Sequence, residues 1–365
     1  MKKDIVVVGG YGHVGGQICR TLAEKFPGDI YAAGRSLDRA EQFCQSTYGK
    51  VKPLELIATS INDWNCLDQT RLVIMCIDQE DTAFARKCME SGIHYVDISA
   101  NGSFLKKLEQ LRNESNIATG VMSVGLAPGL TNLLAQQLKN LFEQTNCINI
   151  SIMLGLGDSH GKAAIEWTVD NLNSVFEVME NSKLKYVSSF TDGRTTYFGE
   201  KLGHREAYRF PFSDQQSLTK TLDVKSVVTR LCFDSRLVTT ALHMLRRIGL
   251  TKLLSKKSVR PLLVKMLSSI RMGSAQYAVK VDAEGLKAGV ESKLGVTLHG
   301  ENESSITAQV AVAVAISLYS SKLSHGIFHV DQLFELDNDG DILYLRLKET
   351  GEQFLISKSC SISYS

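Results

Sequence analysis

The sequence predicts an α/β protein: a doubly wound parallel sheet comes first, and an α+β domain with a mixed sheet follows it. Three observations support this prediction. The β-branched run Asp4–Val8 leads directly into a glycine-rich loop and then into an amphipathic helix. Strand-like and helical segments then alternate to about residue 124, as in a parallel sheet. Beyond that point, apolar and polar residues alternate as in strands with one covered face.

The loop after the first strand carries a G-x-G-x-x-G pattern at Gly10, Gly12 and Gly15. In this pattern the first glycine permits a tight turn, the second leaves room for a pyrophosphate, and the third lets the helix pack on the strand. The next helix points its free N–H groups and positive dipole end at the phosphates. The strand before the loop and the helix after it favour a dinucleotide-binding Rossmann unit over a simple turn.

Three other residues of this loop join the predicted cofactor site. They are Tyr11, His13 and Val14. For Tyr11 two roles remain open: its ring either covers the nicotinamide or only packs against the protein.

The second predicted strand, residues 30–33, indicates which dinucleotide binds. An NAD site usually places Asp or Glu about 20 residues past the glycine loop, where the carboxylate binds the ribose 2′-OH. Here Gly34, Arg35 and Ser36 follow the strand, with Arg39 one turn later. A guanidinium and a hydroxyl suit a 2′-phosphate, so Arg35 and Ser36 predict NADP. The alternative is that this stretch is an ordinary polar loop.

Further strands and helices complete the first predicted domain. Strands are predicted at residues 54–58, 72–76, 93–98 and 117–124, and helices at 81–91 and 102–114. The helix before residue 93 stops at Gly92, a favourable C-cap residue. The strand at 72–76 ends at Cys76 and Ile77, where a Rossmann sheet borders the cofactor ribose and nicotinamide. Both residues are therefore predicted to contact the cofactor.

The second domain is predicted to begin after a turn-rich break at residues 125–132. Strands are expected at 148–154, 184–189, 224–233, 276–281 and 295–299, and helices at 133–142 and 306–323, before a short tail. We assign residues 1–130 to an NADP-binding domain, to which residues 302–335 return. Residues 131–301 form the predicted α+β domain for substrate binding and dimerisation.

Composition narrows the classes of function. A chain of 365 residues accommodates two domains, and its net charge of +2 argues against a general nucleic-acid binder. No run of eighteen apolar residues exists, so no membrane span is predicted. The eight cysteines form no C-x-x-C pair, which favours buried reduced thiols over disulfides or a metal site. The N-terminal apolar run is too short for a signal peptide, so a cytoplasmic protein is predicted.

The break at residues 125–132 and one strand supply candidates for the chemistry. Gly125, Pro128 and Gly129 hold a fixed turn that is predicted to line the nicotinamide pocket or to act as a hinge, and the two roles are compatible. Tyr95 and Asp97 share one face of a strand near its carboxyl end. Catalysis and the orientation of a loop are both open for this pair.

Candidates in the second domain are more scattered. His160 and Lys162 lie in a glycine-rich loop just beyond a strand, and a histidine there is suited to proton transfer. An ordinary surface histidine is the alternative. Arg230 is a candidate clamp for a substrate carboxylate because its guanidinium is a planar fork.

A basic segment at residues 235–272 stands out. It contains nine Lys or Arg and no acidic residue, with leucines at helical spacing. Two interpretations remain: the solvated face of a helical insertion, or a docking surface for an anionic partner such as a carrier protein, a phosphorylated substrate or a membrane surface.

Several of these motifs together resemble the saccharopine dehydrogenase-like family. They are GGYGHVG at 9–15, Ala33-Gly34-Arg35, residues 92–98 and residues 125–135. Residues 165–172, with Trp167, are similar to the family's substrate-domain segment, and residues 326–330 resemble its closing segment. Ala127 stands where family reductases often have Asp.

The resemblance implies a two-domain NAD(P)-dependent oxidoreductase, expected to be a homodimer, that acts on an amine or imine carbon of an amino-acid-like small molecule. It also implies that Asn132 and Trp167 bind substrate. Two alternatives stay open: reduction of a carbonyl or alkene on a lipid or carrier-bound substrate, and a non-catalytic NADP-binding sensor.

Overall fold

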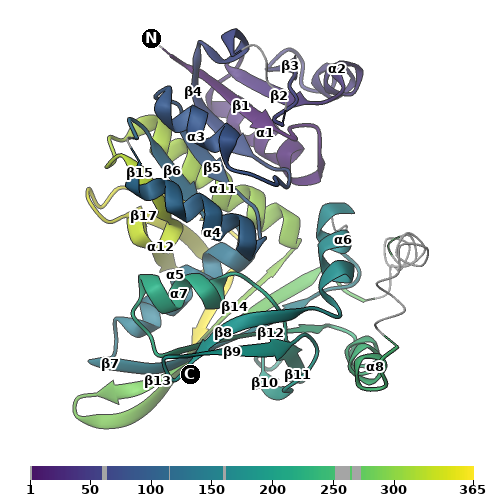
Figure 1. Ribbon diagram of the computed structural model, residues 1–365, viewed down its shortest axis with the longest axis vertical. Helices are drawn as coiled ribbons and strands as arrows, with labels where there is room; N and C mark the ends of the chain where they lie inside the picture. The colour runs from purple at the N-terminus through teal and green to yellow at the C-terminus, as the bar shows by residue number, and fades with distance from the viewer. Residues whose placement is uncertain (1, 60–63, 115, 159–161, 251–263, 265–272) are drawn as a thin grey trace. The chain divides into compact units, whose positions relative to one another are not determined.

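The computed structural model of the protein describes residues 2–59, 64–114, 116–158, 162–250, 264 and 273–365. The chain divides into two compact units (Figure 1). The first comprises Met1–Leu130, Ser305–Asp337 and Tyr344–Ile356. The second comprises Thr131–Ser304, Asn338–Leu343 and Ser357–Ser365.

The first unit is built on a parallel sheet. Within the described residues this sheet has seven strands in the order β15-β6-β5-β4-β1-β2-β3. Their bounds are β1 Asp4–Val8, β2 Ile30–Gly34, β3 Val51–Glu55, β4 Thr70–Met75, β5 His94–Asp97, β6 Thr119–Met122 and β15 Gly326–His329. The strand order reverses at β1, which pairs with β2 on one side and β4 on the other. The prediction of a doubly wound parallel sheet is therefore confirmed.

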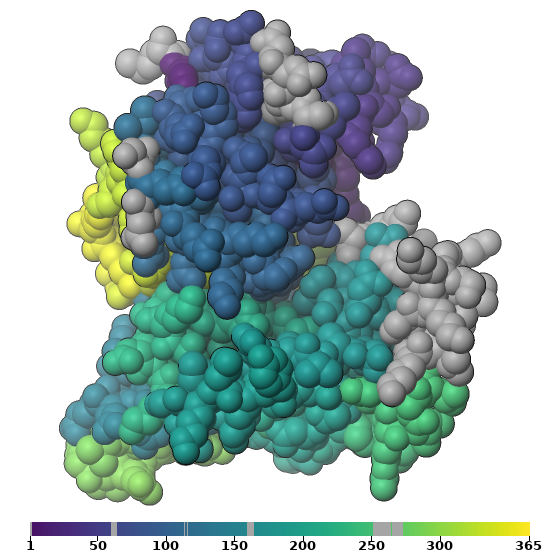
Figure 2. All heavy atoms as spheres, in the orientation of Figure 1, coloured from purple at the N-terminus to yellow at the C-terminus, as the bar shows by residue number. Residues whose placement is uncertain are grey.

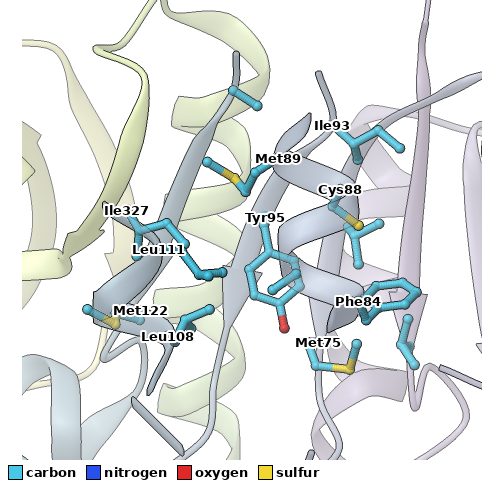
Figure 3. Close-up of a cluster of buried hydrophobic side chains, with 14 of the residues drawn as sticks. Met75, Phe84, Cys88, Met89, Ile93, Tyr95, Leu108, Leu111, Met122 and Ile327 are labelled. Atoms are coloured by element: carbon cyan, nitrogen blue, oxygen red, sulfur yellow. The ribbon is translucent and has the colours of Figure 1, made fainter. Parts of the chain in front are cut away.

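Helices cover both faces of this sheet. Their bounds are α1 His13–Lys25, α2 Leu37–Gln45, α3 Ala83–Glu90, α4 Gly102–Gln110, α11 Glu303–Ser320 and α12 Val330–Leu333. In Figure 1, α3 and α4 lie over one face, with α11 behind the sheet. Buried side chains of α3, such as Phe84 and Met89, pack with those of the strands into one apolar cluster (Figure 3). This core fixes the carboxyl ends of the strands, where a nucleotide binds in such sheets.

The third strand lies three residues earlier than the sequence predicted, at Val51–Glu55 rather than 54–58. The apolar run at 54–58 favoured the later position because Lys52 and Pro53 interrupt the strand pattern. β3 is an edge strand that pairs with β2 alone. An edge strand tolerates a proline because one side of it makes no ladder hydrogen bonds.

The second unit contains the predicted mixed sheet. Its order over the described residues is β10-β11-β12-β7-β13-β14-β19. The bounds are β7 Gln144–Leu154, β10 Arg194–Tyr197, β11 His204–Arg209, β12 Ser226–Phe233, β13 Gln276–Lys287, β14 Val290–Glu301 and β19 Ser361–Tyr364. β12 runs parallel to β7, whereas β13 runs antiparallel to it.

The two faces of this sheet differ in polarity. Ile148, Ile150 and Ile152 of β7 are fully buried, and α5 (Thr131–Lys139) and α7 (Asp214–Thr221) pack on the sheet. The alternate residues of neighbouring strands are polar, since Arg230, Ser151 and Lys280 stand side by side in register. Two more helices, α6 (Lys162–Asn171) and α8 (Arg236–Arg247), and the hairpin β8–β9 (Val175–Glu180 and Lys183–Ser188) complete the unit.

The end of the chain is more structured than the predicted short tail. β16 (Phe334–Asp339), β17 (Ile342–Leu347) and β18 (Gln353–Ser357) form a small sheet, and β19 joins the sheet of the second unit. These strands are only four to six residues long, so each gives a short apolar pattern. No helix in the described part of the chain is long and apolar enough to cross a membrane.

Candidate functional site

The glycine loop joins β1 to α1 and is closely packed. Gly9 has a φ of +82°, so the left-handed turn falls on this residue and not on Gly10, to which the sequence assigned it. A Cβ on Gly10 would lie 2.7 Å from the Cα of Ala32 in β2, and one on Gly15 would lie 2.3 Å from the backbone oxygen of Gly9. Glycine is therefore required at these positions so that the loop and α1 can close onto the sheet.

The amino end of α1 has the form of a phosphate-binding site. Its N-cap residue is Gly12, which has no side chain to cap the helix, and its first turn contains no acidic residue. A Cβ on Gly12 would approach only the backbone oxygen of Gly9, at 2.9 Å. The first turn of the helix, which starts with His13 and Val14, thus offers backbone amides and no acidic side chain. These residues fit a dinucleotide pyrophosphate.

The residues predicted to bind the ribose and its phosphate lie together at the end of β2. Arg35 is exposed, and the Ser36 side chain accepts a hydrogen bond from Arg39 N at 3.3 Å as the N-cap of α2. The Tyr11 hydroxyl accepts a hydrogen bond from Ser36 N at 3.2 Å, and the Arg39 guanidinium lies 5.0 Å from the centre of the Tyr11 ring. A Cβ on Gly34 would lie 2.4 Å from the Tyr11 hydroxyl oxygen.

The position of the Tyr11 ring can be compared with the two roles considered for it. The ring packs over Gly34 at the end of β2, on the far side of β1 from β4. It therefore lies where the adenosine ribose of a dinucleotide is expected, and not at the strand end assigned to the nicotinamide. Tyr11 packs against the protein here, and its role toward a cofactor stays a prediction.

Cys76 and Ile77 lie at the other side of the switch point. Cys76 N donates to the Val8 carbonyl at 2.9 Å, which extends the pairing of β4 with β1. A Cβ on Gly9 would lie 2.8 Å from Cγ2 of Ile77, whose side chain is 42% exposed. Burial raises the pKa of the Cys76 thiol, so the thiol stays protonated at neutral pH. The two residues form an apolar wall beside the glycine loop.

Tyr95 and Asp97 form a buried hydrogen-bonded network at the end of β5. The Tyr95 hydroxyl donates to Asp97 Oδ2 at 2.7 Å, and Ser99 N donates to Asp97 Oδ1 at 2.8 Å. Gln79 Nε2 donates to the Tyr95 hydroxyl at 2.7 Å and lies 3.3 Å from Asp97 Oδ2. Figure 3 shows the Tyr95 ring inside the apolar cluster, with its hydroxyl on the side of Met75.

Burial dominates the electrostatics of this network. It raises the pKa of Asp97 to about 6, although the hydrogen bonds from Tyr95 and Ser99 oppose the shift. Tyr95 and Asp97 have no exposed surface, and the network ties the loop after β4 to the end of β5. The pair thus holds the loop that carries Gln79 against β5, and a catalytic role for it stays a prediction.

The turn at residues 125–130 is buried and cross-linked within the first unit. Leu130 N donates to the Gly125 carbonyl at 2.9 Å, and Leu126 N donates to Oγ1 of Thr307 in α11 at 3.2 Å. Gly129 has a φ of +140°, and the peptide bond before Pro128 is cis. The chain passes from the first unit to the second immediately after this turn, between Leu130 and Thr131.

The sequence analysis missed a buried pair at the neighbouring strand ends. Ser123 follows β6 with a φ of +59°, and its hydroxyl lies 2.8 Å from Nδ1 of His329, the last residue of β15. Nε2 of His329 lies 3.9 Å from Oε1 of Glu109 in α4. A polar residue at the carboxyl end of each of two parallel strands was the signal available, since such ends meet at one edge of a sheet.

Two predicted substrate residues of the second unit are packed against its other residues, Asn132 fully buried and Trp167 half-buried. Asn132 is fully buried and donates from Nδ2 to Ser217 Oγ at 3.2 Å, which links α5 to α7. Trp167 of α6 packs with its ring 5.2 Å from each of the rings of Phe210 and Phe212. Both residues hold the local packing of this unit.

Arg230 is held in a network of hydrogen bonds. Its guanidinium donates to the Asp192 carboxylate at 2.7 Å, to the Asp192 carbonyl at 2.9 Å and to Asn149 Oδ1 at 3.1 Å. Arg209 shares the same Asp192 carboxylate at 2.7 Å. The three nitrogens of the Arg230 fork are thus engaged with protein acceptors.

Some of the remaining candidates cannot be placed. His160 lies outside the described residues, and Lys162 begins α6 with a side chain that is not described. Of the basic segment, Arg236, Arg246 and Arg247 lie in α8, whereas residues 251–263 and 265–272 are outside the described residues.

One known protein family matches the part of the chain that forms this nucleotide-binding geometry. Residues 5–124 match the family described as "Saccharopine dehydrogenase NADP binding domain". The N-terminal unit is saccharopine dehydrogenase-like. The match includes the glycine loop, the end of β2 and the Tyr95–Asp97 network.

One solved structure shares the fold over the whole chain. The apo histidine-tagged saccharopine dehydrogenase (L-Glu forming) from Saccharomyces cerevisiae matches at 13% identity and a TM-score of 0.64, with 100% of each chain covered. The C. glutamicum DAP dehydrogenase in complex with DAP matches at 13% identity and a TM-score of 0.47, covering 90% of this chain and 93% of that one. No curated protein sequence matches the chain.

Proposed function

We propose that this saccharopine dehydrogenase-like protein is an NADP-dependent oxidoreductase. The observation that carries the proposal is the end of β2, where Gly34, Arg35 and Ser36 follow in place of Asp or Glu. Arg35 is exposed and free to approach a 2′-phosphate, and Tyr11 with Ser36 and Arg39 supports the loop beneath it. The pyrophosphate would be held by the amides that open α1.

Bound NADPH supplies the hydride, so the protein's own residues need only orient it, exclude water and provide a proton. Ile77 and the glycine loop would fix one side of the nicotinamide ribose. The Tyr95–Asp97–Gln79 network would keep the loop after β4 in place, because its hydrogen bonds join that loop to β5. The substrate we propose is the amine or imine centre of an amino-acid-like molecule, in keeping with the family of the N-terminal unit.

One observation favours a second candidate function. Ala127 offers no carboxylate to a substrate amine, and Arg230 is already engaged with Asp192 and Asn149. A substrate without an amino-acid head group, such as a carbonyl or alkene compound, would need neither contact. A protein that binds NADP without turnover is the third candidate.

The cofactor proposal is tested by binding. We expect the purified protein to bind NADPH at least tenfold more tightly than NADH, as measured by nucleotide fluorescence, since a charge-assisted pair to the phosphate is worth about 1.5–3 kcal/mol. Arg35→Asp should remove this preference, whereas the matched charge reversal Lys106→Asp on the exposed face of α4 should not. An unchanged preference in Arg35→Asp contradicts the assignment.

The reaction is tested separately. NADPH consumption is followed with a panel of 2-oxo acids, each paired with ammonia or with amino acids, and with carbonyl and alkene compounds alone. Turnover that requires the amine partner supports the amine or imine reaction. Turnover without an amine supports the second candidate, and tight NADPH binding without any turnover supports the third.

A further inference from the structure

Helix α8 leaves part of its apolar surface exposed to solvent. An amphipathic helix normally turns its apolar face to the protein and its polar face to water. Here Thr239, His243 and Arg246 make polar contacts with the protein, with Val238, Leu242 and Leu245 partly buried beside them, and further apolar side chains stay exposed on the opposite side. Figure 2 shows α8, in green, as part of the surface of the second unit.

The inner side of α8 is attached by specific polar contacts. Thr239 is buried, and its hydroxyl accepts a hydrogen bond from Phe233 N at 2.9 Å. The His243 ring stacks on Tyr208 with centroids 4.3 Å apart, and Arg246 Nε donates to the Ser189 carbonyl at 3.2 Å. These contacts fix the rotation of the helix, so the direction of its other face is determined.

The outer side carries an exposed apolar stripe, formed by Leu237, Ala241, Met244 and Ile248. At about 100° per residue these four positions lie within roughly 60° of one another, opposite Thr239 and His243. Leu237 is 85% exposed, Met244 47% and Ile248 66%. Such a contiguous apolar surface marks a binding face, because isolated exposed apolar residues do not align in this way.

Charge indicates what covers the stripe. Arg236 and Arg247 are both exposed and lie beside it on one flank. The sequence from residue 235 to 272 carries nine Lys or Arg and no Asp or Glu. A second copy of the chain docked face to face through the stripe would bring Arg236 and Arg247 of the two copies close together, and that opposes a symmetric dimer through α8. An apolar face flanked by cations is instead complementary to the surface of an anionic bilayer.

We propose that α8 is a membrane-surface docking helix, which inserts Leu237, Ala241, Met244 and Ile248 among the acyl chains of an anionic lipid leaflet while Arg236 and Arg247 meet the headgroups. α8 is 12 residues long, too short to span a bilayer, so the contact is interfacial. The docking helix would bring the second unit to a lipid surface. This inference is independent of the cofactor and of the reaction.

The test is co-sedimentation of the full-length protein with sucrose-loaded vesicles. Vesicles of phosphatidylcholine with about one third phosphatidylserine are compared with pure phosphatidylcholine in 0.1 M salt. We expect binding to the anionic vesicles, little binding to the neutral ones, and release at higher salt, because headgroup attraction is screened.

Three variants locate the contact. Leu237→Gln with Ile248→Gln should weaken binding at least tenfold, since two exposed apolar side chains no longer leave water. Arg236→Gln with Arg247→Gln should weaken it by roughly fivefold for each cation removed. Leu184→Gln on β9 is the matched control, because Leu184 is also an exposed leucine, at 56%, and should bind as the unaltered protein does. Circular dichroism confirms that each variant is folded.

Two results would overturn the proposal. One is the absence of binding to anionic vesicles by the unaltered protein, and the other is equal binding by the Leu237→Gln/Ile248→Gln variant. Sedimentation velocity is run in parallel. If the same variant dissociates a dimer and the unaltered protein does not bind vesicles, the stripe is an interface between copies of the chain.

Discussion

The burial of Asp97 predicts how the free energy of unfolding depends on pH, and the magnitude of the effect follows from the structure. This carboxyl is fully buried at the end of β5, and burial raises its pKa to about 6. In an unfolded chain the pKa of Asp is about 3.9, so the difference is about 2 units, or roughly 3 kcal/mol at about 1.4 kcal/mol per unit. An ionised Asp97 at pH 7 therefore lowers the free energy of unfolding by this amount.

The sign of the pH dependence follows from proton binding. Between about pH 4 and pH 6 the folded state binds more protons at Asp97 than the unfolded state does, so the free energy of unfolding rises as the pH falls. From pH 7 to pH 5 the expected gain from this residue is roughly 1.3 kcal/mol. Asp97→Asn removes the titrating group, so the variant should not show this gain in the free energy of unfolding between pH 7 and pH 5. This expectation holds even if the substitution changes the stability at every pH.

The two tryptophans allow the measurement to be made on one unit. Trp64 packs against the apolar cluster of the first unit near Phe84, and Trp167 lies in the second unit. In a Trp167→Phe background, urea unfolding followed by fluorescence therefore reports the first unit alone. We compare the protein with and without Asp97→Asn at pH 5, 6 and 7. The difference between them should change by about 1 kcal/mol across this range. Identical pH dependence in both proteins would refute the assigned pKa and its cause.

Four further predictions concern single contacts. Gly15→Ala should abolish NADPH binding and lower the free energy of unfolding by more than about 2 kcal/mol, because its Cβ would lie 2.3 Å from a backbone oxygen. The control is Gly28→Ala, which places a Cβ in open space at a φ of +83°. It should lower the free energy of unfolding by about 1 kcal/mol and leave NADPH binding intact. Tyr11→Phe should raise the NADPH Kd by roughly two- to tenfold, since Ser36 N loses its acceptor. Arg230→Met should lower the free energy of unfolding by about 2 kcal/mol; higher KM with unchanged stability would show a substrate clamp instead. Asp214→Asn, followed by Trp167 fluorescence in a Trp64→Phe protein, should flatten the pH dependence of the second unit between pH 5 and 7, because burial also raises the pKa of Asp214 to about 6.

The sequence identified features that depend on neighbours along the chain. The run Asp4–Val8, the glycines after it and Gly34-Arg35-Ser36 lie within one strand–helix–strand unit, so their spacing alone predicts the nucleotide-binding geometry. The alternation of strands and helices to residue 124 likewise predicts the parallel sheet, because short connections leave few other topologies. The Tyr95–Asp97 pairing follows from the two-residue period of a strand.

Tertiary structure decided what depends on residues far apart in the sequence. The sequence presents Arg230 as a guanidinium available to bind a substrate. Its hydrogen-bond partners Asp192 and Asn149 lie on other segments of the second unit, so only the structure shows them. Ser123 and His329 are 206 residues apart and meet only because β6 and β15 are neighbours. The exposed apolar stripe of α8 also depends on tertiary structure: the helical period reveals an apolar side, and only the packing of Thr239 and His243 shows which part of it is turned outward.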